Sequence, residues 1–293
     1  PAEASKTDFI AGRIVTAIET HRGDRPFFFW ASFIDPHQPF APPAPFCDWH
    51  DDVIFPEPAS VGEMPADKPS HYPPQARPEV ARAQWLNLRR MYQGKVSHVD
   101  DRIGRILAAL EERRLAANTI VVLLSDHGVL LGEYGIPSGG AKLCDPCSRV
   151  PMIWCGPGIA RRGVSHGLAS VVDLMPTLLD LAGVDAPPGV QGLSLRPALE
   201  GRACAVRDEL LVEGGRAAEY GVRPCLSKTL LTDHHKLTLY VTPDEGELYD
   251  LHDDPHELSN LYARPEAGSL RQTLVERLAR TLVHAQDPLP ARV

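Results

Sequence analysis

A long amphipathic helix between short apolar runs is the feature that most constrains how this chain can fold. Between residues 85 and 110, apolar side chains recur at steps of three and four, which is the period of a helix that buries one face. Apolar runs at 27–34, 120–124 and 151–155 have the length of buried strands. This alternation predicts an α/β fold with a mostly parallel sheet flanked by helices.

The remaining elements are predicted from capping residues and from a change of sequence character near residue 200. Helices are expected at 7–20 and at 173–181, with Asp173 at the N-terminal cap and Gly183 ending the helix. Beyond residue 200, short strands are expected at 210–213, 225–232, 236–240 and 247–251, followed by one helix at 265–284. We therefore expect residues 1–200 to form the α/β unit and residues 201–293 to form a small antiparallel sheet with a helix.

Composition and charge exclude several classes of function. The 293 residues include 30 Lys and Arg against 38 Asp and Glu, a net charge of -8, and no run of like charge suggests a nucleic-acid surface. No apolar stretch approaches the ~20 residues needed to cross a bilayer. No signal peptide is visible, but the chain begins abruptly at Pro1 without an initiator methionine, so this end does not decide secretion. The cytoplasm is favoured over the periplasm.

Residues 40–78 are dense in proline and show no helical or strand periodicity. This predicts a long surface loop of the kind that is usually functional or mobile.

The six cysteines do not predict a disulfide framework in a chain of this size. Cys144 and Cys147 form a C-x-x-C, but the neighbouring sequence lacks the strand and helix of a thioredoxin-like motif. A structural zinc site would need a second pair of ligands. We therefore expect buried or half-buried thiols.

Two groups of polar residues follow apolar runs directly. His37 comes three residues after the run at 27–34, and Asp126 and His127 follow the run at 120–124. If both strands are parallel, these side chains meet at one edge of the sheet, where open α/β sheets bind ligands. Asp and His are suitable ligands for a divalent cation. The alternative for each is a strand-end cap with a surface histidine.

The chain resembles the sulfatases of the alkaline-phosphatase superfamily in motifs spread along most of its length. The closest matches are SFIDPHQPF at 32–40, SHVDDRIGRIL at 97–107, NTIVVLLSDHGVLLGE at 118–133, RVPMI at 149–153, GPG at 156–158, DLMPTLLDLAG at 173–183 and GELYDLHDDP at 246–255. The family resemblance implies that residues 1–200 are the C-terminal portion of the catalytic domain. It also implies a small-molecule sulfate ester as substrate.

The resemblance also implies roles for particular residues. Asp126 and His127 match the metal-binding pair, with calcium or manganese as the expected ion, and further carboxylates would come from an N-terminal region. The Asp-His pair is more similar to choline sulfatases and phosphonate monoester hydrolases than to arylsulfatases with Asp-Asn. His37 matches the histidine that contacts the transferred group and assists the leaving oxygen.

The sequence departs from the family pattern at two places. Gly139 stands where a catalytic and substrate-binding lysine is expected, so either Lys142 takes that role from a shifted loop or the role is lost. The family's nucleophile is a formylglycine made in a C/S-x-P-x-R motif, and none of the six cysteines begins one. The nearest imitation, which begins at Cys144, is one residue too long. We expect the formylglycine segment to lie upstream of Pro1 in a longer gene product, and the present chain to be inactive alone.

Two other functions stay open at this stage. A phosphodiesterase or phosphonate monoester hydrolase of the same superfamily would use the same tetrahedral geometry and the same cationic groups. A truncated, non-catalytic remnant would keep the fold without the chemistry. Unrelated hydrolase motifs are absent from the sequence: no G-x-S-x-G is present, and residues 135–142 imitate a phosphate-binding loop with the lysine one place late.

Overall fold

The structure is a computed structural model that describes residues 5–23, 25–60, 64–70, 72, 78–136, 143–160, 163–216, 225–241 and 245–285. Its helices, with 3₁₀ turns labelled η, are α1 (Lys6–Thr20), α2 (Pro78–Glu112), η2 (Ala116–Asn118), η3 (Glu133–Gly135), α3 (Asp145–Ser148), η4 (Val171–Asp173), α4 (Leu174–Leu181), α5 (Arg196–Leu199), η5 (Pro265–Ala267) and α6 (Gly268–His284). Its strands are β1 (Val121–Leu124), β2 (Met152–Cys155), β3 (Glu209–Arg216), β4 (Cys225–Thr232), β5 (His235–Tyr240) and β6 (Gly246–Asp250). The predicted helices and most predicted strands are confirmed.

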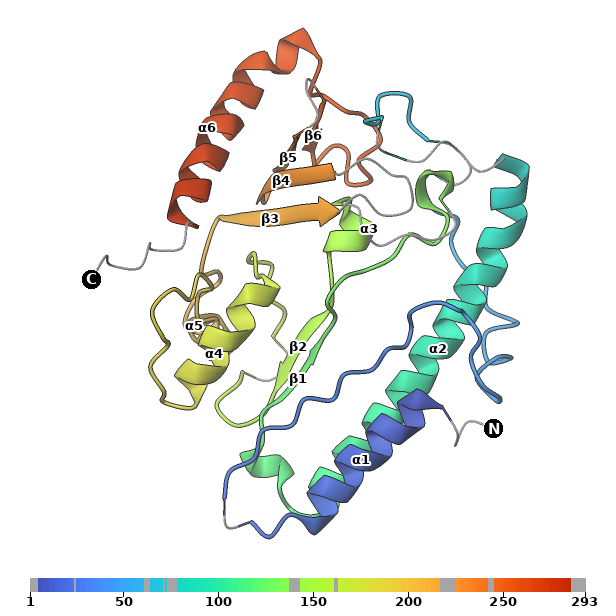
Figure 1. Ribbon diagram of the computed structural model, residues 1–293, viewed down its shortest axis with the longest axis vertical. Helices are drawn as coiled ribbons and strands as arrows, with labels where there is room; N and C mark the ends of the chain where they lie inside the picture. Colours follow the sequence, from blue (N-terminus) through green and yellow to red (C-terminus); the bar gives the residue numbers. More distant parts are fainter. Residues whose placement is uncertain are drawn as a thin grey trace.

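Helices α1 and α2 lie side by side and form the core of the N-terminal half (Figure 1). Ile18 of α1 is buried against Ala109 and Leu110 of α2, because apolar residues recur at helical period on both helices. Phe27 and Val121 pack against the same cluster, so it also anchors the start of the extended segment and of β1. No helix of the described chain is both long and apolar enough to cross a membrane.

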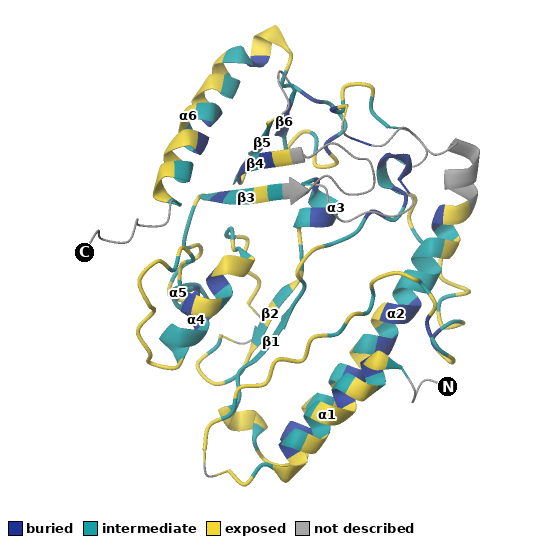
Figure 2. Cartoon of the chain, viewed as in Figure 1, coloured by how far each residue is buried: buried dark blue, intermediate teal, exposed yellow. Residues whose placement is uncertain are grey.

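The segment at 27–34 is extended but is not a strand, so the predicted buried strand is wrong. Phe27 packs on the helices, whereas Phe28 is 70% exposed and Trp30 is 62% exposed. Figure 2 shows most of this segment in the colour of exposed residues. A strand needs neighbours for its N–H and C=O groups, and no segment among the described residues forms a ladder with this one. Its aromatic composition indicated the extended conformation correctly but not the burial.

A mostly parallel sheet was expected, and the structure pairs β1 and β2 antiparallel. Val121 lies opposite Cys155, and Leu124 lies opposite Met152. Parallel neighbours require a crossover connection of a dozen or more residues, usually with a helix. Between β1 and β2 the described helical elements are only η3 and the four-residue α3, so the chain returns beside β1 in the opposite direction. Every strand pairing within the described residues is antiparallel.

Asp173 stands before α4 as predicted, but its carboxylate does not cap that helix. It accepts hydrogen bonds from the backbone N–H of Ser170 and of Leu193, each at 2.8 Å. It also forms a two-pronged ion pair with Arg207 at 2.8 and 2.5 Å, and it is fully buried. Asp173 therefore joins three segments, and Gly183 ends the helix with a φ of +69°, as expected.

The C-terminal quarter is a four-stranded antiparallel sheet in the order β3-β4-β5-β6, covered on one face by α6 (Figure 1). Leu230, Leu237 and Leu248 of the sheet are fully buried against Leu274 and Leu278 of the helix. Apolar residues at alternate strand positions and at helical steps produce this contact. The predicted subdomain of antiparallel sheet and helix is confirmed, and the boundary near residue 200 stays a prediction.

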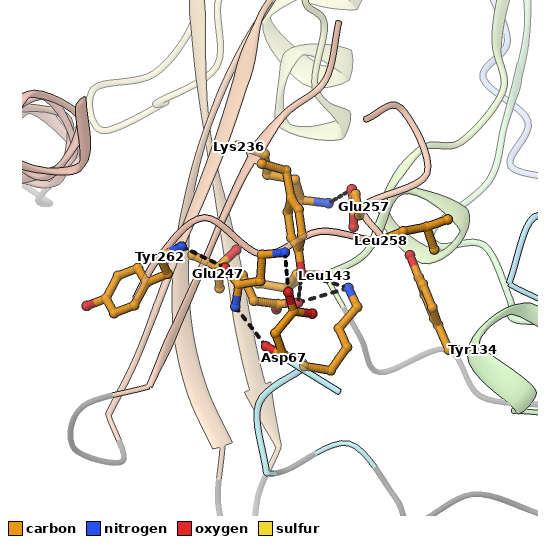
Figure 3. A network of polar contacts seen from close by, with 12 residues as sticks. Asp67, Tyr134, Leu143, Lys236, Glu247, Glu257, Leu258 and Tyr262 are labelled. Carbon is orange, nitrogen blue, oxygen red and sulfur yellow. Dashed lines mark hydrogen bonds and ion pairs between the residues drawn. The ribbon is translucent and has the colours of Figure 1, made fainter. Parts of the chain in front are cut away.

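Buried ion pairs fasten this sheet to the rest of the chain (Figure 3). Lys68 Nζ lies 3.0 Å from Glu247 Oε1 on β6, and Lys236 Nζ on β5 lies 2.6 Å from Glu257 Oε1. The same Glu257 oxygen accepts the backbone N–H of Asp145 at the start of α3, at 3.2 Å. The sheet is thereby linked to the segment that connects β1 with β2.

Candidate active site

Asp126 and His127 lie on the exposed turn that begins one residue after β1. The side chain of Asp126 is 87% exposed and that of His127 is 52% exposed. Asp126 Oδ1 accepts the backbone N–H of His127 at 2.9 Å, and Ser125 Oγ donates to the carbonyl of His127 at 3.0 Å. These local bonds fix the turn and leave both side chains accessible to a ligand.

The donor atoms of this pair suit one divalent cation. His127 Nδ1 lies 2.8 Å from the carbonyl of Gly128, and because a carbonyl only accepts, the neutral ring carries its proton on Nδ1 and presents a lone pair on Nε2. Nε2 lies 3.8 Å from Asp126 Oδ2, a separation that one cation can bridge with ligand bonds of ~2.0–2.4 Å. No group of three or more His, Cys, Asp or Glu side chains in the described part of the chain could hold a metal. The pair therefore offers at most two ligands of a metal site, and a complete site would need more.

The turn after Asp126 and His127 is held against α3 by backbone contacts. The N–H of Gly128 donates to the carbonyl of Cys147 at 2.7 Å. A Cβ atom at Gly128 would lie 2.1 Å from the carbonyl oxygen of Pro146, so only glycine fits there. The glycine that follows Asp126 and His127 in the motif therefore allows the backbone of this turn to pack directly on the backbone of α3.

His37 lies on an exposed turn directly after the extended segment. Its Nδ1 is 2.7 Å from the carbonyl of Gln38 and therefore donates, which leaves Nε2 for a ligand. Figure 1 shows the extended segment and β1 running in the same direction, and both begin at the cluster that holds Phe27 and Val121. His37 and Asp126 thus each follow the far end of their segment. Their convergence on one ligand stays a prediction.

Two other residues singled out by the sequence have different outcomes. Lys142 lies outside the described residues, so its predicted role is untested. Glu133, the last residue of the 118–133 motif, pairs with Arg89 of α2 at 2.6 Å and accepts the backbone N–H of Leu131 at 2.6 Å. Glu133 therefore fixes the loop after β1 to the long helix.

Cys144 and Cys147 are both buried, at 2% exposure, as expected for structural thiols. The hydrogen bond with Cys147, together with burial, raises the pKa of the Cys144 thiol well above its ordinary value. A protonated thiol is a poor nucleophile, so this environment is the opposite of the one that activates cysteine. Cys155 and Cys204 are exposed, which the sequence did not predict.

Sequence reasoning missed the basic residues of α2 that hold these loops. Arg89 Nε donates to the carbonyl of Leu131 at 3.3 Å, in addition to its ion pair with Glu133. Lys95 is buried and donates to the carbonyl of His37 at 2.6 Å. The available signal was a basic residue next to the apolar stripe of a long helix, where a charge needs a partner.

Comparison with known proteins is consistent with this arrangement. The sulfatase family model matches residues 3–184, and the model described as N-sulphoglucosamine sulphohydrolase, C-terminal, matches residues 140–284. An arylsulfatase of Clostridium perfringens is 30% identical over 93% of this chain and 57% of its own length. The phosphonate monoester hydrolase of Silicibacter pomeroyi superposes with a TM-score of 0.85 at 25% identity, covering 98% of this chain and 61% of that one.

A further structure, BT4656 in complex with its substrate D-glucosamine-2-N,6-O-disulfate, superposes with a TM-score of 0.84 at 24% identity, over 97% of this chain and 70% of that one. The chain spans about half the length of the curated relatives that it matches. The structural neighbours confirm an α/β fold of the alkaline-phosphatase type, while the mostly parallel sheet stays a prediction, and the family models confirm the resemblance found in the motifs. The chain belongs to the sulfatase family.

Proposed function

We propose that this chain supplies the metal-binding and leaving-group side of a hydrolase that acts on a small-molecule sulfate ester. The observation that carries the proposal is the exposed pair of donors, Asp126 Oδ2 and His127 Nε2, 3.8 Å apart directly after β1. A pair of free metal ligands at a strand end suits polarisation of a tetrahedral ester.

Asp126 and His127 would hold the cation beside the bound ester, together with ligands from outside this chain. When bound, calcium or manganese would supply the positive charge that polarises the sulfuryl oxygens. None of the six cysteines lies in a C-x-P-x-R motif, so the formylglycine expected for the family is assigned to an upstream segment. The residues of this chain would bind and orient the ester rather than attack it.

His37, protonated on both ring nitrogens, is proposed to give its Nε2 proton to the leaving oxygen and to keep the Nδ1 proton. Its Nδ1 donates to the carbonyl of Gln38, and this bond fixes the orientation of the ring relative to the turn. Lys142 is proposed to neutralise the remaining negative charge on the transferred group, because Gly139 at the position expected from the family cannot. In the active protein, Lys142→Ala should lower kcat and leave folding stability unchanged.

The second candidate is hydrolysis of a phosphodiester or phosphonate monoester. It is favoured by the Asp-His pair and by the close superposition on a phosphonate monoester hydrolase. Sulfate and phosphate esters share tetrahedral geometry, so the same cation and the same histidine serve both. A third possibility, a non-catalytic remnant, would leave Asp126 and His127 without a chemical role.

The test compares the 293-residue chain with a version extended by its own upstream coding sequence. Each is assayed on 4-nitrophenyl sulfate, bis(4-nitrophenyl) phosphate and a phenyl phosphonate ester, with calcium, manganese or a chelator. We expect turnover of the sulfate only by the extended protein and only with metal. Asp126→Asn should lower this turnover by roughly 100-fold or more, because a metal supplies several kcal/mol of transition-state stabilisation.

The control is Asp233→Asn, an exposed aspartate on the turn between β4 and β5, which should leave turnover unchanged. Preference for the phosphonate or the phosphodiester would support the second candidate. Absence of turnover on all three esters by an extended protein that carries C-x-P-x-R would support the non-catalytic one. Turnover by the short chain that is lost in Cys144→Ala would overturn the assignment of the nucleophile.

A further inference from the structure

The turn that carries His37 is short of backbone hydrogen-bond donors. Pro36 and Pro39 have no N–H, so two positions of the five-residue turn at 35–39 cannot donate. The N–H of His37 donates to the carbonyl of Ile34 at 3.0 Å. The exposed turn therefore depends on partners outside its own backbone for a fixed conformation.

Lys95 of α2 supplies those partners with one ammonium group. Its Nζ lies 2.6 Å from Asp35 Oδ1, 2.6 Å from the carbonyl oxygen of His37 and 3.0 Å from that of Pro39. An ammonium has three protons, and each has an acceptor on this one turn. Lys95 is 6% exposed, so the contacts are shielded from solvent. We infer that Lys95 is a positioning residue for His37, holding the Asp35 carboxylate before the imidazole and the backbone carbonyls of His37 and Pro39 after it.

The second oxygen of Asp35 is held independently from α1. Thr7 Oγ1 donates to Asp35 Oδ2 at 2.7 Å, and Thr7 is 1% exposed. His98 Nδ1 lies 4.0 Å from the same oxygen. Asp35 is thus fixed between two packed helices, and Lys95 transmits that fixed position to the carbonyls of His37 and Pro39.

A close approach of backbone to helix continues along the same loop. A Cβ atom at Gly94 would lie 2.5 Å from the carbonyl oxygen of Phe46 and 2.8 Å from Pro42 Cγ. The residues that follow the His37 turn therefore lie directly on α2 beside Lys95. The ammonium of Lys95 holds the turn at 35–39, and the packing on Gly94 holds the loop further along. Removal of the ammonium should therefore move the turn without releasing the whole loop.

The inference rests on the proposed role of His37, and the experiment separates the two. In the full 293-residue chain labelled with ¹⁵N-histidine, the His37 ring signal is assigned by its loss in His37→Gln. Lys95→Met should shift or broaden that signal while the circular-dichroism spectrum stays native. Arg90→Met is the matched control, because Arg90 of the same helix donates to the carbonyl of Asp51, outside the turn. This control should leave the His37 signal in place.

In the extended, active protein, Lys95→Met should lower kcat with little change in KM. A misplacement of about 1 Å costs roughly 100-fold in rate, and the loss should be greater for an alkyl sulfate than for 4-nitrophenyl sulfate, which needs less help in departure. Lys95→Arg keeps the positive charge but replaces the ammonium with a planar guanidinium, which cannot reach all three acceptors in the same way. Compared with Lys95→Met, it should therefore recover more of the folding stability than of kcat. This split would not follow from a purely structural role.

The outcomes can be told apart. An unchanged His37 signal in folded Lys95→Met overturns the inference. If Lys95→Met does not fold, the His37 signal is measured in Lys95→Arg and in Thr7→Val, which removes the other anchor of Asp35. An unchanged His37 signal in both folded variants then overturns the inference. If the signal moves as expected but His37→Gln keeps full turnover, the positioning contact stands. In that case only the proposed role of His37 in the reaction fails.

Discussion

The N–H of Gly128 donates to the carbonyl of Cys147 at 2.7 Å, and this bond ties the turn after β1 to α3. The contact is tight, because a Cβ atom at Gly128 would lie 2.1 Å from the carbonyl oxygen of Pro146. Asp126 and His127 precede Gly128 directly. Their position is therefore set by backbone packing as well as by β1.

Gly128→Ala should displace this turn and destabilise the chain. The clash is with backbone rather than with a flexible side chain, so the expected loss is about 1–3 kcal/mol of unfolding free energy. Urea denaturation followed by circular dichroism measures it. Gly104→Ala is the control: Gly104 lies in α2 with open space around its Cβ position, and the change should stabilise by about 0.5–1 kcal/mol. Equal effects of the two variants would contradict the packing argument.

The sequence singled out the candidate residues of the site, whose roles stay predictions, but it did not reveal the contacts that hold them. His37, Asp126 and His127 follow apolar runs, and that spacing is visible in one chain. The contacts of Lys95 with the His37 turn and of Gly128 with Cys147 join segments distant in sequence. Periodicity and propensity describe neighbours along the chain, so they carry no information about such pairs.

The buried ion pair between Lys236 and Glu257 offers a second test. Both side chains are almost fully buried, at 5% and 2% exposure. Lys236→Met should leave Glu257 as an uncompensated buried charge and cost about 3–5 kcal/mol. Lys228→Met on the neighbouring strand removes an exposed pair with Glu213, 44% and 55% exposed, and should cost about 0–1 kcal/mol. Urea midpoints of the two variants should differ accordingly, and similar midpoints would refute the assignment.

The fold was predicted most closely where local pattern and packing agree. β4 begins and ends at the predicted bounds, 225 and 232, and its Leu230 and the Leu237 of β5 are fully buried in the core. In α2 the agreement is weaker: Val96 of the predicted apolar stripe is 36% exposed, whereas the neighbouring Lys95 and His98 are buried. These polar residues are buried because carboxylates from distant segments meet them, which hydrophobic period cannot reveal.

Two buried carboxyls near the C-terminal sheet have pKa shifts of opposite sign. Burial raises the pKa of Glu257 above its ordinary 4.5, and the charge of Lys236 only partly offsets this. Burial also acts on Glu247, but the charge of Lys68 and hydrogen bonds, including one from the Tyr249 hydroxyl, outweigh it and lower the pKa of Glu247 below 4.5. The two groups should therefore contribute oppositely to the dependence of stability on pH.

The signs follow from proton linkage. Glu247 stabilises the fold above its unfolded pKa, and that contribution is lost as the pH falls through its lower folded pKa. The contribution of Glu257 is present below its unfolded pKa and is lost as the pH rises through its higher folded pKa. Urea unfolding of Glu247→Gln and Glu257→Gln from about pH 3 to about pH 7 checks this by linkage. Relative to the unmodified chain, Glu247→Gln should become progressively less stable as the pH rises, and Glu257→Gln progressively more stable. Slopes of the same sign for the two variants would show that one of the two shifts is assigned in the wrong direction.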